Sequence, residues 1–265
     1  VTCRKREWKD HLEQLPNSGF TPFHVPLLDK EQVLKWTKLY TDHHLAEVKE
    51  PEVFVSSLAK SLSSPHSLDL FGSPLRLTMT CETYGPAGEL PENLTVTKLY
   101  NDYWNSRIET DRFRQRGNRA AKSIKAAKKL ARKLWGSSHQ RFTEYCYMDK
   151  TSTGIKALAS EGIIHFLNDK AAFFHQSFAE YAIARHLAAK GEEADWSRLE
   201  TGLAAGIASD WGIVSHLVNL KLDPLTFNDV LACLPDNVPE SIRLVWRGLV
   251  QQGDLDALKN RVQVE

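Results

Sequence analysis

The sequence of 265 residues contains no Gly-Lys pair, so the phosphate-binding loop G-x-x-x-x-G-K-[ST] is absent from it. It also lacks a run of four apolar residues ending in acids, the pattern of a magnesium-binding strand. Without the loop amides, the lysine and the metal ligand, phosphoryl transfer has neither positioning nor charge neutralisation. These residues alone are therefore not expected to hydrolyse a nucleoside triphosphate.

Cysteine is scarce, and long apolar runs are missing. The four cysteines form no C-x-x-C pair, which indicates neither a zinc site nor a disulfide framework and favours a reducing compartment. No apolar run approaches the roughly 18 to 20 residues that span a bilayer, and the first ten residues contain no signal-peptide core. We therefore expect a soluble, cytoplasmic protein without a membrane segment.

Positive charge is concentrated in one stretch of the chain. Between Arg107 and Arg141 there are twelve Lys/Arg and two acids, a local balance of +10, whereas the whole chain carries +1. The remaining residues must then carry −9. A run of this kind is most often the solvated face of a helix, and its alternative interpretation is a nucleic-acid surface.

Residues 28–92 contain the signals of three helices. Asp29 and Gln32 have capping-box spacing, and the helix they begin has apolar residues at Val33, Leu34, Trp36, Leu39 and Tyr40. A second helix follows Pro51. A third begins at Ser73-Pro74, because the missing N–H of proline costs nothing in the first helical turn.

Residues 93–188 predict a helix, helix, β-hairpin order. Ala120–Trp135 has an apolar stripe with lysines on the other side, and Thr153–Ser160 is a second helix. Two short strands, Ile163–Leu167 and Ala172–Phe174, are joined by a turn at Asn168-Asp169-Lys170. This order is typical of a winged helix.

The stretch Ala171–Leu187, AAFFHQSFAEYAIARHL, joins an apolar strand to an amphipathic helix. Ser177 and Glu180 have capping-box spacing, so the helix is predicted to start near Ser177. His175 would then lie two residues before the cap, near the positive end of the helix, where anions bind. From the residues alone, His175 is either a partly buried side chain bonded to a carbonyl or a phosphate-binding or acid–base group.

Three stretches together resemble the NACHT-type STAND NTPases. The Ala171–Leu187 segment is similar to their F-x-H-x-S-F-x-E-Y-x-A-x-x-L signature. The Pro74–Tyr100 segment resembles P-L-x-L-x-x-x-C-x-x-Y followed by L-P and then L-Y, and Gly72-Ser73-Pro74 resembles their G-x-P motif. V-T-C-R at residues 1–4 resembles the family's first sensor motif, a strand that ends in arginine.

The resemblance implies a role in nucleotide binding for three residues. His175 would touch the β-phosphate of bound ADP, Pro74 would pack against the adenine ring, and Arg4 would face the γ-phosphate. The implied cofactor is ATP or ADP, with Mg²⁺ held by residues outside this chain. On local pattern alone, Arg4 is a solvated charge after a strand and Pro74 is a helix start.

The resemblance also implies a fold and a domain order. We expect a mainly α chain that begins with the remnant of a P-loop α/β core. Residues 1–27 would be the terminal part of that nucleotide-binding core, 28–92 a helical domain, 93–188 a winged-helix domain and 189–265 a second helical domain. The Walker motifs and an effector domain would then lie upstream of Val1, and a ligand-sensing domain would follow the C-terminus.

The function implied is an ADP-closed, ATP-open switch that oligomerises on activation, with defence against invaders as the commonest role of the family. The parent protein would be an ATPase, although this chain lacks the catalytic motifs. One alternative is a winged-helix DNA-binding regulator, although the helix expected in the groove, residues 153–160, offers only Lys156 as a basic side chain. Another is an interaction scaffold that binds no nucleotide.

Overall fold

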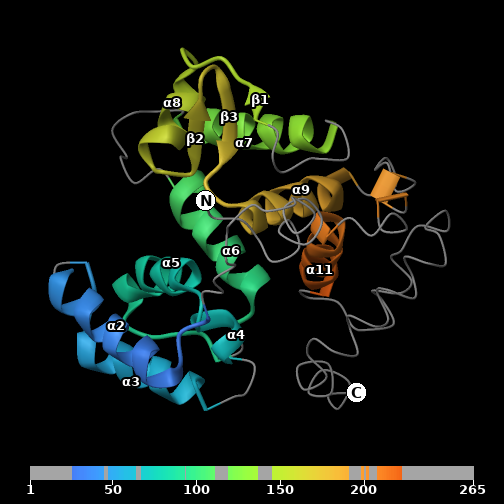
Figure 1. The fold of residues 1–265 in the computed structure, drawn as a ribbon. Coiled ribbons are helices and arrows are strands. Elements are labelled where there is room, and N and C mark those ends of the chain that lie inside the picture. Colours follow the sequence, from blue (N-terminus) through green and yellow to red (C-terminus); the bar gives the residue numbers. More distant parts are fainter. Residues whose placement is uncertain are drawn as a thin grey trace, which may run out of the picture. The chain divides into compact units, whose positions relative to one another are not determined.

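The computed structural model describes residues 26–44, 47–63, 67–92, 94–110, 119–136, 145–190, 198–199, 201–202 and 208–222. The fold is mainly α with one small three-stranded sheet, which confirms the predicted fold class (Figure 1). The chain divides into two compact units, residues 1–90 and 91–265. A division into two units does not test the boundaries of the four predicted domains, so these domains stay a prediction. The predicted remnant of an α/β core, residues 1–27, lies outside the described residues except for its last two.

All the regular elements described in the first unit are helical. Its elements are α2 (Lys30–His43), α3 (Pro51–Ser61), α4 (Ser67–Phe71), α5 (Pro74–Tyr84) and the 3₁₀ turn η2 (Gly85–Ala87). The predicted capping box starts α2: Gln32 N–H donates to the Asp29 carboxylate over 2.8 Å, and Asp29 N–H donates to Gln32 Oε1 over 3.0 Å. Ser73 is the N-cap of α5 as predicted, although its hydroxyl makes no capping bond.

The buried face of α2 differs from the predicted apolar stripe. Leu39 is 51% exposed, whereas Thr37 and Thr41 are buried beside Val33. Thr37 Oγ1 donates to the Val33 carbonyl over 2.8 Å, and Thr41 Oγ1 donates to the Lys38 carbonyl over 2.9 Å. Because the helix itself satisfies both hydroxyls, the two threonines can occupy the core at little cost. Leu39, one of the apolar residues of this helix, therefore does not belong to its buried face.

The second unit combines helices with the sheet. Its helical elements are α6 (Val96–Trp104), the π-helical turn η3 (Asn105–Glu109), α7 (Arg119–Gly136), α8 (Thr153–Ser160), α9 (Gln176–Lys190) and α11 (Ala208–Leu222). The strands are β1 (Cys146–Tyr147), β2 (Ile164–Leu167) and β3 (Lys170–Phe173), antiparallel in the order β1-β3-β2. Helix α8 has the predicted bounds. Strand β3 begins two residues earlier than predicted, because Lys170 pairs with both Tyr147 and Leu167.

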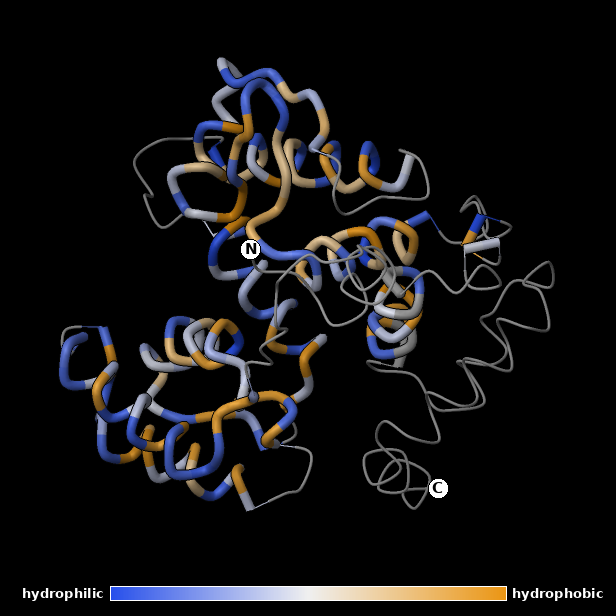
Figure 2. The backbone as a smooth tube through the Cα atoms, in the orientation of Figure 1, coloured by the Kyte–Doolittle hydropathy of each residue, from blue (hydrophilic) through white to orange (hydrophobic). Residues whose placement is uncertain are grey.

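Helix α9 is the centre of the second unit. Its buried residues point to every side of the helix: Phe178, Ala179, Tyr181, Ala182, Ile183, Ala184 and Leu187. A helix buried all round requires neighbours on several faces. Helices α6, α7 and α11 pack against it, and Figure 2 shows hydrophobic residues at many positions of α9 and α11. The Glu180 carboxylate of α9 lies against Gly212 of α11, where a Cβ would displace it.

Only part of the C-terminal region is described. Of residues 189–265, predicted as a second helical domain, the structure describes the last two residues of α9, the short pieces 198–199 and 201–202, and α11. The helices predicted after Leu222 lie outside the described residues. Within the described segments, no helix is both long enough and apolar enough to cross a membrane.

Candidate functional site

His175 lies at the junction of β3 and α9, where its carbonyl accepts the N–H of Ala179 over 3.0 Å. His175 is therefore the N-cap residue of α9. The helix begins at Gln176, so Ser177 lies inside it, and the predicted capping box of Ser177 with Glu180 was wrong. Glu180 Oε1 instead accepts from Gln176 Nε2 over 2.7 Å. The residue at the N-cap position of α9 is therefore His175, and not Ser177 as predicted.

The hydrogen bonds of the imidazole define its tautomer. Ser177 N–H donates to His175 Nδ1 over 3.1 Å, and Ser177 Oγ lies 2.8 Å from the same nitrogen. A backbone N–H can only donate, so Nδ1 must accept, and the proton of the neutral ring is assigned to Nε2. His175 is exposed. The start of α9 thus carries an exposed imidazole whose Nε2 is a hydrogen-bond donor in the uncharged state.

The hydroxyl groups of Ser177 and Tyr100 connect the His175 ring to the core. Ser177 Oγ, besides its contact with Nδ1, lies 2.6 Å from the hydroxyl of Tyr100 on α6. With Nδ1 as the final acceptor, Tyr100 O–H donates to Ser177 Oγ, and Ser177 O–H donates to His175. Tyr100 is fully buried. The orientation of the exposed imidazole therefore depends on a residue in the core.

The core behind this chain of hydroxyl groups is aromatic. Phe178 of α9 is fully buried. Six rings lie with their centroids 5.0 to 6.1 Å from the Phe178 ring: those of Tyr100, Tyr103, Trp104, Phe173, Phe174 and Tyr181. Large close-packed rings leave a side chain little freedom to move. This cluster joins β3, α6 and α9 and sets the direction in which α9 starts.

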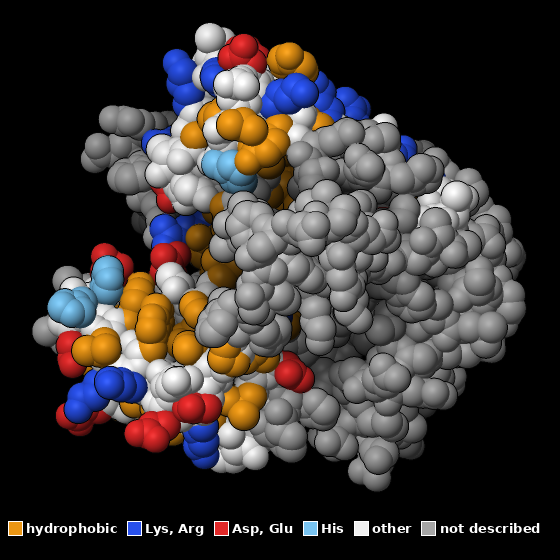
Figure 3. All heavy atoms as spheres, in the orientation of Figure 1, with side chains coloured by type: hydrophobic (Ala, Val, Ile, Leu, Met, Phe, Trp, Pro, Cys, Tyr) orange, Lys and Arg blue, Asp and Glu red, His pale blue; other side chains and the backbone are white. Residues whose placement is uncertain are grey.

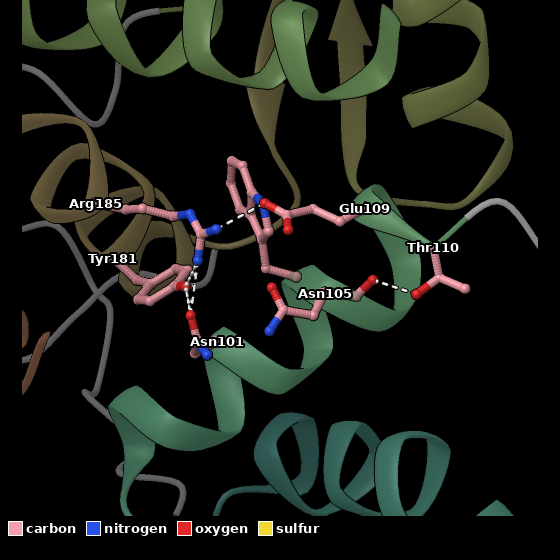
Figure 4. Close-up of polar contacts among 7 residues, drawn as sticks. Asn101, Asn105, Glu109, Thr110, Tyr181 and Arg185 are labelled. Carbon is pink, nitrogen blue, oxygen red and sulfur yellow. Dashed lines mark hydrogen bonds and ion pairs between the residues drawn. The ribbon is translucent and has the colours of Figure 1, made fainter. Parts of the chain in front are cut away.

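Two turns further along α9, Arg185 anchors a polar cluster with α6 and η3 (Figure 4). Arg185 Nη1 donates to Asn101 Oδ1 over 2.7 Å and to Tyr181 Oη over 3.1 Å. Arg185 Nη2 donates to Glu109 Oε1 over 2.6 Å. Trp104 Nε1 donates to the same carboxylate oxygen over 3.0 Å, and the Arg185 guanidinium lies 5.2 Å from the centroid of the Trp104 ring. The cluster holds three elements together through charge-assisted hydrogen bonds.

Two local features support the Arg185 cluster. In η3 the hydrogen bonds run to the fifth residue back, as in Thr110 N–H to the Asn105 carbonyl, and this wider turn brings Trp104 and Glu109 toward the same face. Burial raises the pKa of Tyr181 to about 12, while the nearby Arg185 charge opposes that rise. Tyr181 therefore stays protonated and donates its hydroxyl hydrogen to Asn101 Oδ1 over 3.0 Å.

The sequence did not predict the Arg185 cluster. Asn101, Asn105 and Glu109 recur every four residues, as do Tyr181 and Arg185, so each set indicates a polar stripe on one helix. Nothing in either spacing indicates that the two stripes meet. The sequence therefore indicated the two polar stripes but not the contact between them.

The other two predicted site residues lie elsewhere. Pro74 is exposed at the first position of α5, in the unit of residues 1–90, whereas His175 belongs to the unit of residues 91–265. Arg4 lies outside the described residues. The structure therefore relates none of the three to another.

In the described segments, no three His, Cys, Asp or Glu side chains lie close enough together to hold a metal ion. Comparison with protein-family models gives no match, and a search of curated proteins gives none either.

Proposed function

We propose that this chain is part of a nucleotide-gated switch of the NACHT-type STAND class, in which His175 contacts the β-phosphate of bound ADP. Pro74 packs against the adenine ring and Arg4 faces the γ-phosphate position. Exchange of ADP for ATP releases the β-phosphate contact, the winged-helix region swings away, and the opened molecules oligomerise. Such a switch needs two states that contact the nucleotide differently, and His175 supplies the difference.

The observation that carries the proposal is the tautomer of His175. With Nδ1 accepting from Ser177, the neutral ring offers Nε2–H to a phosphate oxygen without first gaining a proton. The ring also stands at the N-terminus of a 15-residue helix, where the helix dipole attracts anions. Pro74 supports the proposal in a smaller way, because an exposed proline ring at a helix start offers an apolar surface to a base.

The proposal places the remaining parts of the switch outside this sequence. The phosphate-binding loop, the Mg²⁺ ligands and an effector domain lie upstream of Val1, and a ligand-sensing domain follows the C-terminus. The setting is the cytoplasm, and the process is immune or antiphage defence. Hydrolysis of ATP, where it occurs, belongs to the longer protein.

Two measurements test the proposal. The reading frame upstream of Val1 should encode a G-K-[ST] loop, and a stop codon or an unrelated sequence there would overturn the switch. In the protein that includes this loop, calorimetry should show that His175→Ala weakens ADP binding about tenfold, the loss of one charge-assisted hydrogen bond. His165→Ala is the matched control, because His165 is an exposed histidine of the same unit. Equal ADP affinity in both variants would leave His175 as a helix cap alone.

A second candidate, DNA binding through the winged-helix region, is favoured by the basic face of α7. The exposed basic side chains of this helix follow one another at helical spacing: Lys122, Lys125, Lys128, Lys129 and Arg132. Figure 3 shows Lys and Arg side chains over the part of the second unit that holds the sheet and α7. Phosphate contacts by these groups predict duplex binding that falls steeply with salt. Neutralising Lys125, Lys128 and Lys129 together should flatten that salt dependence, and an unchanged slope would exclude this face.

A further inference from the structure

A cleft of about 260 Å³ opens beside the C-terminal half of α9. Its lining comes from three helices: Trp104 of α6, Lys128 of α7, and Ala182, Arg185, His186 and Ala189 of α9. The two alanines leave the space that larger side chains would fill. Arg185 follows His175 by ten residues, which is roughly 15 Å along a helix, so this cleft is separate from the His175 site.

The charges around the cleft are mostly positive. Lys128, Arg185 and His186 line it, and Arg132 and Lys190 lie close enough to act on the charge of His186. The acid that contacts Arg185 in the described structure is Glu109, whose Oε1 accepts from both Arg185 and Trp104. None of the described residues that line the cleft is acidic. The cleft lies toward the negative end of the α9 dipole, so side chains, not the helix end, create the positive potential.

We propose that this cleft binds a compact phosphate anion, such as diphosphate or the terminal phosphates of a small polyphosphate ligand. Lys128 supplies a flexible ammonium at the exposed side, and Arg185 supplies a guanidinium already held in place by Asn101 and Glu109. A preorganised cation loses little freedom when the anion arrives. The volume exceeds that of one phosphate group, and the excess of positive charge suits a ligand with two or more negative charges.

His186 makes the binding sensitive to pH. Burial lowers the pKa of His186, and the cations Lys190, Arg132 and Lys128 lower it further. Arg185 and Glu109 are the other charged groups at the cleft. An anion in the cleft offsets the cations and raises the pKa of His186 again. By linkage, protonation of His186 strengthens anion binding, so the affinity for an anion of constant charge increases as the pH falls through the range in which His186 takes up its proton.

The test uses the full chain and inorganic diphosphate at fixed ionic strength, with the His186 imidazole followed by NMR. Diphosphate should shift this signal in a saturable way. Lys128→Glu should weaken the affinity about tenfold or more, because it reverses a charge at the cleft. Lys122→Glu, a matched change at an exposed position of the same helix, should alter it by less than about twofold. No saturable binding, or equal losses in the two variants, would overturn the proposal.

Two further arms identify the source of the phosphate and the role of His186. Sulfate keeps its charge across the relevant pH range, and its affinity should rise with falling pH in the natural protein but not in His186→Gln. An equal rise in both proteins would contradict the assigned site. A DNA duplex that binds when diphosphate does not, with equal sensitivity to the two lysine changes, would place phosphate recognition along the face of α7 and overturn binding in the cleft.

Discussion

Ser177 donates its backbone N–H to Nδ1 of His175 over 3.1 Å, so a side chain two residues before the donor satisfies one of the unpaired amides at the start of α9. The same bond determines which nitrogen of the imidazole carries the proton. His175 thus has a structural role, as a helix cap, and a second role as a neutral ring with its proton on Nε2. The two roles can be separated by substitution.

Replacing His175 by alanine should destabilise the protein by about 1 kcal/mol, the usual cost of losing an N-cap acceptor. His175→Asn should recover most of that loss, because an asparagine oxygen can accept from the same backbone N–H. Urea unfolding at neutral pH measures both differences. If the asparagine variant were no more stable than the alanine variant, the hydrogen bond to Ser177 would not contribute to stability.

The ion pair of Arg185 with Glu109 should contribute more than a surface ion pair does. Its side chains are 26% and 33% exposed, the N···O distance is 2.6 Å, and the Glu109 oxygen also accepts from Trp104. A double-mutant cycle with Glu109→Gln and Arg185→Met should give a coupling free energy of about 1–2 kcal/mol. Urea unfolding of the four proteins provides the values.

The pair Lys150–Asp169 is the control for that cycle. It belongs to the same unit, but its side chains are 44% and 78% exposed, so its coupling should be about 0.5 kcal/mol or less. Equal coupling in the two pairs would mean that the partial burial of Arg185 does not strengthen its interactions.

These contacts show which parts of the structure could be predicted from the sequence. The cap of α2 and the bounds of α8 depend on residues within one or two turns of each other, and the sequence patterns predicted both. The Arg185 contacts join residues 76 and 84 positions apart, and no local spacing reports such a meeting. The burial of Thr37 in place of Leu39 likewise depends on which face of α2 the first unit covers.

The candidate site was likewise predictable only where its residues lie close together in the sequence. The stretch around His175 was recognisable because strand, cap and helix follow one another along the chain. Its capping residue was misassigned, since Ser177 with Glu180 has an ideal spacing and histidine is seldom expected as a cap. The hydrogen bond between Tyr100 and Ser177 spans 77 positions. Only the packing of α6 against α9 reveals it.

Gly154 should be essential for the packing of α8 on α7. A Cβ at this position would overlap the Lys122 carbonyl oxygen and lie 3.1 Å from the Cβ of Ala126. Because backbone atoms cannot move aside as a flexible side chain can, Gly154→Ala should destabilise the protein by about 2–3 kcal/mol in thermal or urea unfolding. Gly136→Ala is the control, since a Cβ at Gly136 meets nothing within 4 Å and should change stability by less than about 1 kcal/mol.

Cys81 should make the stability of the protein fall in alkaline solution. Burial, with a smaller contribution from the Glu82 charge, raises the pKa of the Cys81 thiol from 9.0 to about 12. The unfolded chain therefore releases this proton near its ordinary pKa, while the folded chain retains it. Between these two values the native state binds more protons, so the free energy of unfolding decreases as the pH rises, by about 1.4 kcal/mol per pH unit for this group.

Urea unfolding across the lower part of that window should show the decrease, and Cys81→Ala should reduce the slope by this amount. Because Tyr181 also has a raised pKa, the free energy of unfolding of the alanine variant should still decrease with pH, starting near pH 10.0, but less steeply than that of the natural protein. Identical slopes in the two proteins would show that the Cys81 thiol ionises in the folded state as readily as in the unfolded one.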